Sequence, residues 1–424
     1  MLLPSLVARK LGTLDAAAKR FEVNQLFTPS TPINVAELFA GRVPQLFKIV
    51  DAIGERGPHV ILFGERGVGK TSLAQIIPYV VPAKIKTVKP IRVQAFPNDD
   101  FSSIARKIFK EIRFVSDAGE GDKLYDVAQL YPSEINPDDF IREFTINFNE
   151  NDIPIAVIDE FNELRDEDAR LLIANTIKAL SDAGVNVTII VVGVADNVTQ
   201  LLQKHESIDR CTEEVPMPRM TTDELKELVE KRIKKLGMSI VSDAKWTIIN
   251  LSKGLPSYAH GLGKFGCFRA LERSSLNVTA DDVSIAIDNF IESSQQSLKS
   301  AYELAVRSNQ PGNLFREVLT SCALARADDS GYFTPAAVRD PLSAILKRNI
   351  GIANFQNHLK EFTTQKRRNI FQRIGEERSY RFRFREPGMQ PFVIMRGIRD
   401  DIVDEAARQA LSFPEQPDLF ATSL

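Results

Sequence analysis

The chain has 424 residues, too many for one compact core, so we expect two or three domains. Its formal net charge of −2 excludes a general attraction to nucleic acid, and such a partner would need a local basic patch. Cys211, Cys267 and Cys322 stand singly, which argues against a cysteine-based metal site and for a reducing compartment. No apolar run approaches membrane-spanning length, so we expect a cytoplasmic protein with no membrane partner.

Residues 1–35 are predicted to be an N-terminal extension. Apolar side chains at helical spacing in 5–20 indicate an amphipathic helix outside the main domain. The turn Phe39-Ala40-Gly41-Arg42 follows, and Pro44 suits the first turn of the helix expected after it.

The most informative stretch is residues 59–73, an apolar run that ends at Gly64 and is followed, after four residues, by Gly69, Lys70 and Thr71. This is the G-x-x-x-x-G-K-[ST] pattern between a strand and a helix. Glycines let such a loop curl so that backbone N–H groups point at phosphate oxygens, and the helix aims its positive end there. Lys70 is placed to reach the β- and γ-phosphates of ATP, and the Thr71 hydroxyl to bind Mg²⁺. The predicted nucleotide-binding residues of the loop are Gly64, Glu65, Arg66, Gly67, Val68, Gly69, Lys70, Thr71 and Ser72.

A second informative stretch, residues 153–160, is predicted to be a strand buried on both faces that ends in Asp159 and Glu160. Ligands of parallel sheets bind at the carboxyl ends of the strands, so we expect both carboxylates to face the phosphate loop. Asp159 is then the second metal residue, holding Mg²⁺ through water beside Thr71. Glu160 polarises the attacking water and is catalytic together with Lys70.

The remaining segments of this region alternate between strand and helix. Residues 91–96 and 187–194 read as strands, and 162–183 as a long helix. This alternation predicts an α/β fold for residues 36–217, a three-layer sandwich with a parallel sheet.

Together these motifs resemble the AAA+ ATPase superfamily, closest in look to its origin-recognition, helicase-loader and STAND-type members. Gly64–Thr71 corresponds to Walker A, Ile155–Glu160 to Walker B and Ala195–Asn197 to the sensor-1 region. The resemblance implies ATP and Mg²⁺ as ligands and places Gly41 and Arg42 on the adenine side of the site.

Asp209-Arg210-Cys211 is similar to the Ser-Arg-Cys motif of clamp loaders. The similarity implies that Arg210 is a catalytic arginine finger for the nucleotide of a neighbouring subunit, which requires a homo-oligomer. The alternative is that Arg210 pairs with Glu213 or Glu214 on the surface.

Residues 218–295 hold four helical patterns, 221–236, 242–252, 257–274 and 279–293, which resemble the small helical lid of AAA+ proteins. No arginine stands where sensor 2 is expected. Gly254-Leu255-Pro256 resembles instead the GxP motif of STAND ATPases, which implies that Pro256 packs on the adenine. The alternative is an ordinary helix start with proline in its first turn. The missing arginine favours a slow, switch-like ATPase.

Residues 300–400 suggest three helices, 313–325, 334–346 and 352–363, and then two strands, 369–374 and 380–384. This order predicts a winged-helix-like domain, followed by a tail, 401–424. In 380–385 a period of two puts the aromatic side chains inward and the arginines outward. Residues 352–385 can therefore bind double-stranded DNA, or the arginine face can be a solvated, structural strand. The basic residues are Lys360, Lys366, Arg367, Arg368, Arg373, Arg378, Arg381, Arg383 and Arg385.

The sequence thus predicts a protein that binds and hydrolyses ATP, self-associates with ATP and binds double-stranded DNA through a C-terminal winged helix. The alternative is a nucleotide-switched, STAND-like scaffold in signalling or defence that recruits a protein partner. The Gly-Leu-Pro entry favours the scaffold, and the basic ribbon favours DNA.

Overall fold

The computed structural model describes residues 3–29, 31, 36–81, 86–116, 123–202, 208–328, 330–376, 379–404 and 406–407. It divides into two compact units. We call Pro32–Pro218 the core unit, and Met1–Thr31 with Arg219–Leu424 the lid unit. Arg378 and most of the predicted tail lie outside the described residues. The domain boundaries expected from the sequence stay predictions.

The core unit is built on one five-stranded parallel sheet with the strand order β2-β5-β6-β1-β7. Hydrogen bonds pair every neighbouring strand in parallel. The central strands are almost wholly apolar and buried, as expected for a parallel sheet that is covered on both faces. The predicted α/β fold is confirmed. The strands are β1 (His59–Gly64), β2 (Thr87–Gln94), β5 (Asp152–Asp159), β6 (Thr188–Val194) and β7 (Thr212–Pro216).

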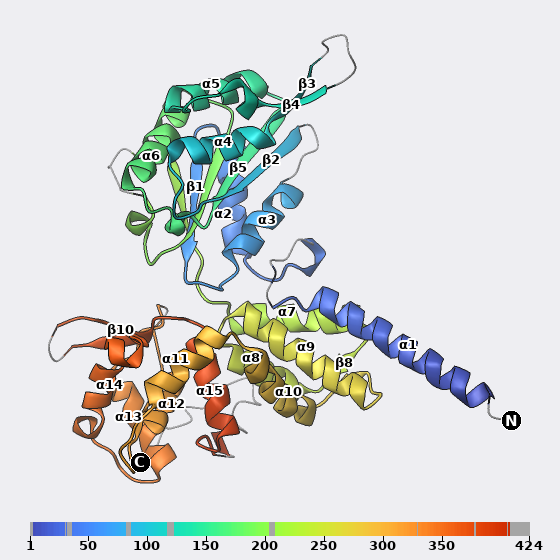
Figure 1. Ribbon diagram of the computed structural model, residues 1–424, viewed down its shortest axis with the longest axis vertical. Coiled ribbons are helices and arrows are strands. Elements are labelled where there is room, and N and C mark those ends of the chain that lie inside the picture. Colours follow the sequence, from blue (N-terminus) through green and yellow to red (C-terminus); the bar gives the residue numbers. More distant parts are fainter. Residues whose placement is uncertain are drawn as a thin grey trace. The chain divides into compact units, whose positions relative to one another are not determined.

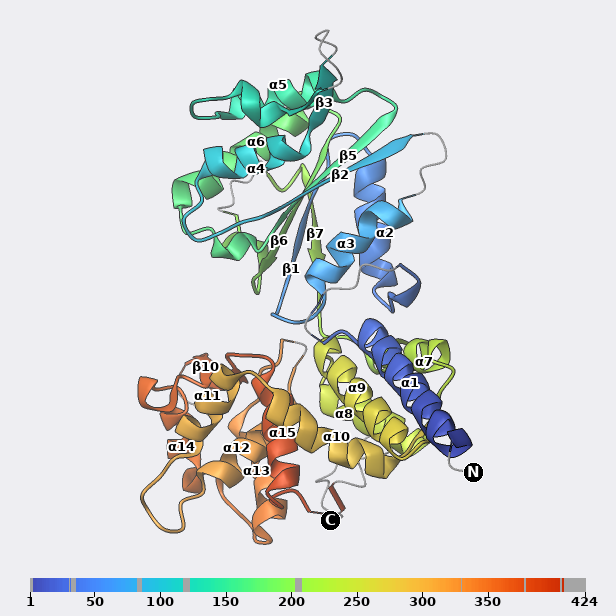
Figure 2. The same cartoon turned by 45° about the vertical axis from the view of Figure 1, so that its right-hand side comes forward.

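Helices cover both faces of this sheet, which makes the three layers (Figures 1 and 2). One face carries α2 (Val43–Gly54) and α3 (Lys70–Val80). The other carries α4 (Phe101–Glu111), α5 (Pro137–Asn147) and α6 (Glu167–Asp182), over a large apolar core. A short antiparallel hairpin, β3 (Arg113–Ser116) and β4 (Lys123–Asp126), lies beside them.

The helix predicted over 162–183 was wrong at its start. The Asp166 side chain accepts a hydrogen bond from the Ala169 N–H, which begins α6 at Glu167. Part of the preceding segment, Phe161–Glu163, forms a 3₁₀ turn shortly after β5. The described residues of the core unit form three further 3₁₀ turns, Ala36–Leu38, Val127–Leu130 and Val198–Gln200.

The lid unit contains the four predicted lid helices, α7 (Thr222–Lys235), α8 (Ser242–Ser252), α9 (Pro256–Glu272) and α10 (Ala280–Ser293). The predicted capping pair is present, because the Thr221 and Glu224 side chains each accept a backbone N–H of the other residue. Two-residue strands, β8 (Ser239–Ile240) and β9 (Asn277–Val278), join the loops between these helices.

The N-terminal helix α1 (Leu3–Leu26) packs along α9 in the same unit (Figure 1). Phe27 is fully buried and meets the His260 ring edge-on. The buried Arg232 donates a hydrogen bond of 3.0 Å to the Leu26 carbonyl, so a cation sits at the carboxyl end of α1. These contacts attach the N-terminal helix to the lid.

The C-terminal part begins with α11 (Gln296–Val306). It continues as α12 (Phe315–Leu324), α13 (Pro335–Leu346), α14 (Gln356–Glu361), β10 (Phe371–Ile374) and β11 (Arg381–Phe384), and closes with α15 (Met389–Arg399). An extended residue between α12 and α13, Phe333, bridges Phe382 of β11. Three helices, this bridge and the antiparallel ribbon have the arrangement of a winged helix, as predicted.

The structure bears on the predicted aromatic face of β11 and on the predicted helix 352–363. The aromatic side chains of β11 point inward, where Phe382 and Phe384 pack with Phe333 and Phe371. The helix predicted over 352–363 was wrong in its extent. The segment starts as a 3₁₀ turn, Ile352–Asn354, and α14 is short.

No helix in the described part of the chain has the length and apolar character needed to cross a lipid bilayer. Cys211, Cys267 and Cys322 are all buried and free.

Candidate phosphate-binding site

The phosphate loop begins where β1 ends at Gly64, and its backbone conformation depends on glycine. Gly64, Gly67 and Gly69 have φ values of 153°, 84° and 99°, a region that side chains with a Cβ atom rarely enter. A Cβ atom on Gly64 would lie 2.3 Å from the Met217 carbonyl oxygen. Helix α3 starts immediately after the loop, so its amino end faces the same space as the loop.

Lys70, the first residue of α3, is only 8% exposed. Its Nζ donates hydrogen bonds of 3.0 Å to the Gly64 carbonyl and 2.7 Å to the Glu65 carbonyl. Burial lowers the pKa of Lys70 to about 8, against the opposing pull of Glu160, Asp159 and Glu65. The amine is therefore mostly protonated at neutral pH and places a positive charge inside the loop.

The two predicted metal residues lie side by side. Thr71 Oγ1 donates a hydrogen bond of 3.4 Å to Asp159 Oδ1, although the two residues are 88 positions apart in the sequence. Asp159 Oδ1 also accepts the Glu160 N–H at 2.8 Å. A hydroxyl and a carboxylate are hard oxygen ligands of the kind that Mg²⁺ takes, directly or through water. The residues present therefore fit the ion that the sequence implies.

Glu160 follows Asp159 with φ 53° and ψ 35°, in the left-handed region. Such a conformation costs of order 1–3 kcal/mol for a residue other than glycine, and it recurs at functional sites. The turn that begins here closes with a hydrogen bond of 2.8 Å from the Glu163 N–H to the Glu160 carbonyl.

Asn162 is a residue of this region that sequence reasoning missed. Its Oδ1 accepts a hydrogen bond of 2.7 Å from the Val194 N–H at the end of β6, and its carbonyl accepts one from Arg170. The side chain thus fastens the turn after Glu160 to the neighbouring strand. No local pattern signals the bond, because its partners are 32 positions apart.

Arg42, expected on the adenine side, contacts the loop itself. It is 3% exposed and lies in the left-handed region with φ 62°, directly after Gly41 with φ 66°. Its Nη2 donates a hydrogen bond of 3.0 Å to the Val68 carbonyl. The turn before α2 is therefore tied to the phosphate loop.

A match to a family model shows the family to which the chain belongs. Residues 32–257, more than half of the chain, match the family described as novel STAND NTPase 1. The chain belongs to this family. The expected relationship to STAND-type ATPases is confirmed. A search of curated proteins found no match.

Solved structures are similar to this chain at low sequence identity. A Walker-type ATPase of Pyrococcus abyssi is 17% identical, with a TM-score of 0.53, and the match covers 88% of this chain and 99% of that one. Cdc6p of Pyrobaculum aerophilum is 16% identical, with a TM-score of 0.47 and coverage of 89% and 98%. The Aeropyrum pernix ORC1 protein, solved in complex with DNA, is 15% identical, with a TM-score of 0.47 and coverage of 91% and 97%.

The proposed arginine finger of this STAND NTPase is exposed. Arg210 lies in a turn just before β7. Glu213, one of its two suggested surface partners, pairs instead with Lys48 at 2.8 Å. Within the described ranges, Arg210 forms no ion pair or hydrogen bond with an acidic side chain. Its action across a subunit boundary stays a prediction.

In the sensor-1 region, the Asn197 side chain forms hydrogen bonds with residues of the turn that follows it. Its Oδ1 accepts hydrogen bonds from the Gln200 N–H and the Thr199 hydroxyl, which caps the 3₁₀ turn Val198–Gln200.

The Gly254-Leu255-Pro256 entry of this STAND NTPase belongs to the lid unit. Pro256 is half-buried and is the first residue of α9. Gly254 has φ 79°, and a Cβ atom there would lie 2.5 Å from Arg219 Cβ. The Gly254 carbonyl accepts the Met220 N–H at 2.9 Å, so the entry is packed against the residues just before α7.

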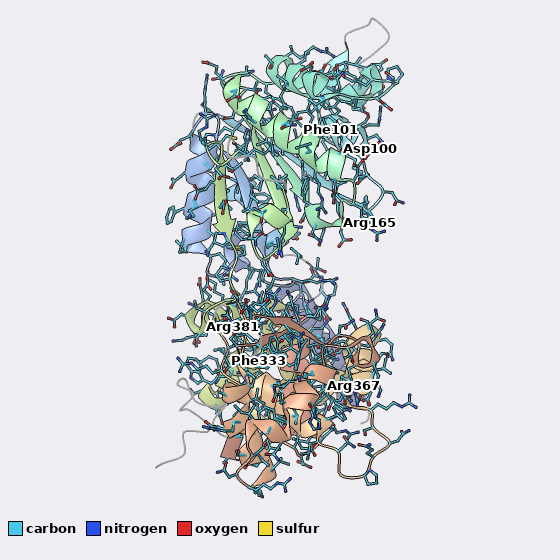
Figure 3. The ribbon with its side chains drawn as sticks, turned by 90° about the vertical axis from the view of Figure 1, so that its left-hand side faces the viewer. Asp100, Phe101, Arg165, Phe333, Arg367 and Arg381 are labelled. Atoms are coloured by element: carbon cyan, nitrogen blue, oxygen red, sulfur yellow. The ribbon has the colours of Figure 1, made fainter. Side chains whose placement is uncertain are left out.

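The basic residues predicted for DNA differ in what they contact, and two of them, Arg367 and Arg381, are labelled in Figure 3. Arg367 is only 4% exposed, donates to the Ala305 and Arg307 carbonyls, and lies 3.6 Å from the centre of the Phe315 ring. Its role is therefore structural. Arg381 pairs with Asp328 at 3.0 Å, and Arg383 lies over Tyr332 at 4.7 Å. The remaining described ones are exposed. Arg373 lies over the Tyr380 ring at 4.3 Å, and, within the described ranges, the others have no acidic partner: Lys360, Lys366, Arg368 and Arg385.

Proposed function

We propose that this chain binds ATP in the Gly64–Thr71 loop and hydrolyses it slowly. The observation that carries the proposal is the Thr71–Asp159 contact of 3.4 Å, because it joins the loop to the end of β5. A phosphate-binding loop, a hydroxyl–carboxylate pair and the adjoining Glu160 are the parts that phosphoryl transfer to water requires. The family match supports nucleotide binding as the shared property.

Each residue has a definite role in this proposal. Lys70 exchanges its two loop carbonyls for phosphate oxygens and stabilises their negative charge. Thr71 and Asp159 hold Mg²⁺, which neutralises phosphate charge when bound. Glu160 accepts a hydrogen bond from the attacking water and orients it toward the phosphorus atom. The absence of a sensor-2 arginine from the sequence supports slow turnover.

Glu160→Gln tests the hydrolytic part. The amide keeps the shape of the side chain but cannot take the proton of water, so we expect turnover to fall about 100-fold or more. The dissociation constant for ATP should change less than about threefold. Lys70→Ala should instead weaken ATP binding itself. Unchanged turnover in Glu160→Gln would contradict the proposed mechanism of hydrolysis.

We further propose that the chain self-associates with ATP and that Arg210 completes the site of a neighbouring copy. The exposed position of Arg210 supports this role. Specific activity should then rise with protein concentration, and Arg210→Ala should abolish that rise without weakening ATP binding. A concentration-independent activity in the unaltered chain contradicts the proposal.

Double-stranded DNA is the proposed partner of residues 352–385. This proposal is supported by four exposed cations that have no acidic partner among the described residues and are therefore available to phosphates: Lys360, Lys366, Arg368 and Arg385. Arg381 and Arg383 of β11, which contact Asp328 and Tyr332, do not count toward this surface. Binding should weaken steeply as salt is added, since each phosphate contact releases counterions.

A second candidate is a nucleotide-switched scaffold that recruits a protein partner. Membership of the STAND family and the Gly254-Leu255-Pro256 entry favour it. Sizing Glu160→Gln with ATP, with and without duplex DNA, separates the two functions. Assembly that needs DNA supports the DNA-binding function, and assembly without DNA supports the scaffold.

A further inference from the structure

The contact between Arg42 and the phosphate loop has a consequence for the direction of a backbone amide. The Val68 carbonyl and the Gly69 N–H belong to one planar peptide group and point to opposite sides of it. Arg42 Nη2 holds the carbonyl at 3.0 Å. The same bond therefore fixes where the Gly69 N–H points, on the opposite side of the peptide plane from the guanidinium.

The residues on either side of this peptide restrain its rotation only in part. The Val68 side chain is 1% exposed and the Gly69 carbonyl accepts the Leu73 N–H at 3.0 Å, but neither contact holds the Val68 carbonyl itself. Gly69 has φ 99° and no side chain to oppose a flip, and Gly67 on the other side of Val68 also has a positive φ. A Cβ atom on Gly67 would meet nothing within 4 Å, so the loop is not held by packing there. A hydrogen bond to the Val68 carbonyl is thus an effective way to hold the peptide in one orientation.

The conformation of Arg42 itself argues that the side chain matters. A left-handed residue other than glycine costs about 1–2 kcal/mol, and Arg42 follows Gly41, which is left-handed too. Packing and hydrogen bonds of the side chain must offset that cost. The guanidinium is also permanently charged, so a buried positive charge stands behind the loop.

We propose that Arg42 is a positioning residue, which holds the Val68–Gly69 peptide so that the Gly69 N–H faces the nucleotide phosphates. It does so without touching the nucleotide, in contrast to the adenine-side role expected from the sequence. The inference rests on the proposed binding of ATP to this loop. In this role Arg42 affects the binding of the phosphates, and recognition of the base belongs to other residues.

The decisive experiment compares three ligands that share only phosphates: ATP, GTP and inorganic tripolyphosphate. Arg42→Gln should weaken all three by the same factor, about 10- to 100-fold, because the loss of one preorganised donor is common to them. Arg42→Lys should recover part of the loss, since an ammonium can still donate to the Val68 carbonyl. Arg56→Gln, an exposed arginine of the same unit that pairs with Glu150, is the matched control and should change nothing.

An unequal loss, with ATP weakened more than tripolyphosphate, would show an adenine contact and overturn the positioning role. Equal affinities in Arg42→Gln and the unaltered chain would overturn it as well. If the unaltered chain binds none of the three ligands, the proposed ATP function fails.

A second measurement then still tests Arg42. Labelling with ¹⁵N-glycine reports on 22 amides, including Gly69, in the ligand-free protein. Arg42→Gln should shift the Gly69 amide signal and speed its hydrogen exchange, while glycines outside the loop keep theirs. Thermal unfolding of Arg42→Lys and Arg42→Gln checks that both variants fold. An unchanged Gly69 signal overturns the inference.

Discussion

The side-chain oxygen of Gln390 accepts a hydrogen bond of 2.6 Å from the Arg219 guanidinium. The nitrogen of the same amide donates to the Ala323 carbonyl at 3.1 Å. Gln390 lies on α15 and is 8% exposed, so one buried amide joins Arg219, shortly before α7, to the end of α12. Tyr258 adds a second link through its hydroxyl, which donates to the Gly388 carbonyl. The lid helices and the winged-helix part are therefore bonded to each other within one unit.

Gln390→Ala should lower the free energy of unfolding of the lid unit by about 1–3 kcal/mol, because it deprives a buried carbonyl and a guanidinium of their partner. Trp246, the single tryptophan of the sequence, lies on α8 and reports this unit by fluorescence during urea unfolding. The control is Gln365→Ala, which removes an exposed glutamine. Equal midpoints for the two variants would contradict the structural role of Gln390.

ATP binding should be accompanied by proton uptake near pH 8. The pKa of Lys70 is lowered by burial to about 8, so the amine is about half neutral at that pH in the free protein. Phosphate oxygens favour the charged amine and raise its pKa, and a proton is therefore taken up on binding. Affinity should accordingly fall as the pH rises above 8.

Calorimetric titrations at pH 8 in two buffers of different ionisation enthalpy measure this uptake directly. Lys70→Arg is the control, because a guanidinium stays charged and takes up no proton. A binding heat that is the same in both buffers for the unaltered chain would contradict the prediction.

The lid unit should lose stability as the pH falls below about 6.5. Burial, together with the nearby Arg232 charge, lowers the pKa of His260 well below its ordinary value. Between the folded and the unfolded pKa only the unfolded chain binds the proton, so acid favours unfolding by about 1.4 kcal/mol per pH unit. Protonation would also cost the bond in which the Thr28 N–H donates to His260 Nδ1 at 3.0 Å.

His260→Gln keeps an acceptor for Thr28 and does not titrate. Unfolding followed by Trp246 fluorescence from pH 7.5 to 5.5 should show a shallower loss of stability in this variant. Some slope remains, since burial also lowers the pKa of His358 in the same unit. Parallel curves for the variant and the unaltered chain would show that His260 does not carry the effect.

Two adjacent arginines offer a matched test of the DNA surface. Arg367 is buried on Phe315 and bonded to two carbonyls, whereas Arg368 is exposed. Arg367→Ala should destabilise the lid unit by about 2–4 kcal/mol through lost packing and unpaired carbonyls. Arg368→Ala should leave the free energy of unfolding within about 0.5 kcal/mol and weaken duplex binding. The slope of the logarithm of the binding constant against the logarithm of the salt concentration should decrease in magnitude by about 1.

Fluorescence anisotropy of a labelled duplex over a salt series, beside urea unfolding, separates the two variants. If Arg368→Ala binds duplex DNA as the unaltered chain does, Arg368 does not contribute to the DNA surface.

Much of the local structure could be predicted from the sequence. Helix α8 has the predicted bounds, 242–252, and α7 starts where the Thr221–Glu224 capping pair indicates. Such signals act within a few residues, so they are readable without the fold. The start of α6 was misplaced because Asp166 is a local cap that was overlooked, and the burial of Arg367 was missed because its carbonyl partners lie 60 and 62 positions away.

The sequence by itself determined the phosphate loop and the two carboxylates at the end of β5, because glycine spacing, strand length and the strand-to-helix order are properties of short segments. Tertiary structure alone decided the partners of Arg42, Asn162 and Gln390. Their bonds reach across 26, 32 and at least 67 positions. Which distant carbonyl or amide lies within 3 Å of a side chain depends on how the elements pack, and no local propensity encodes that distance.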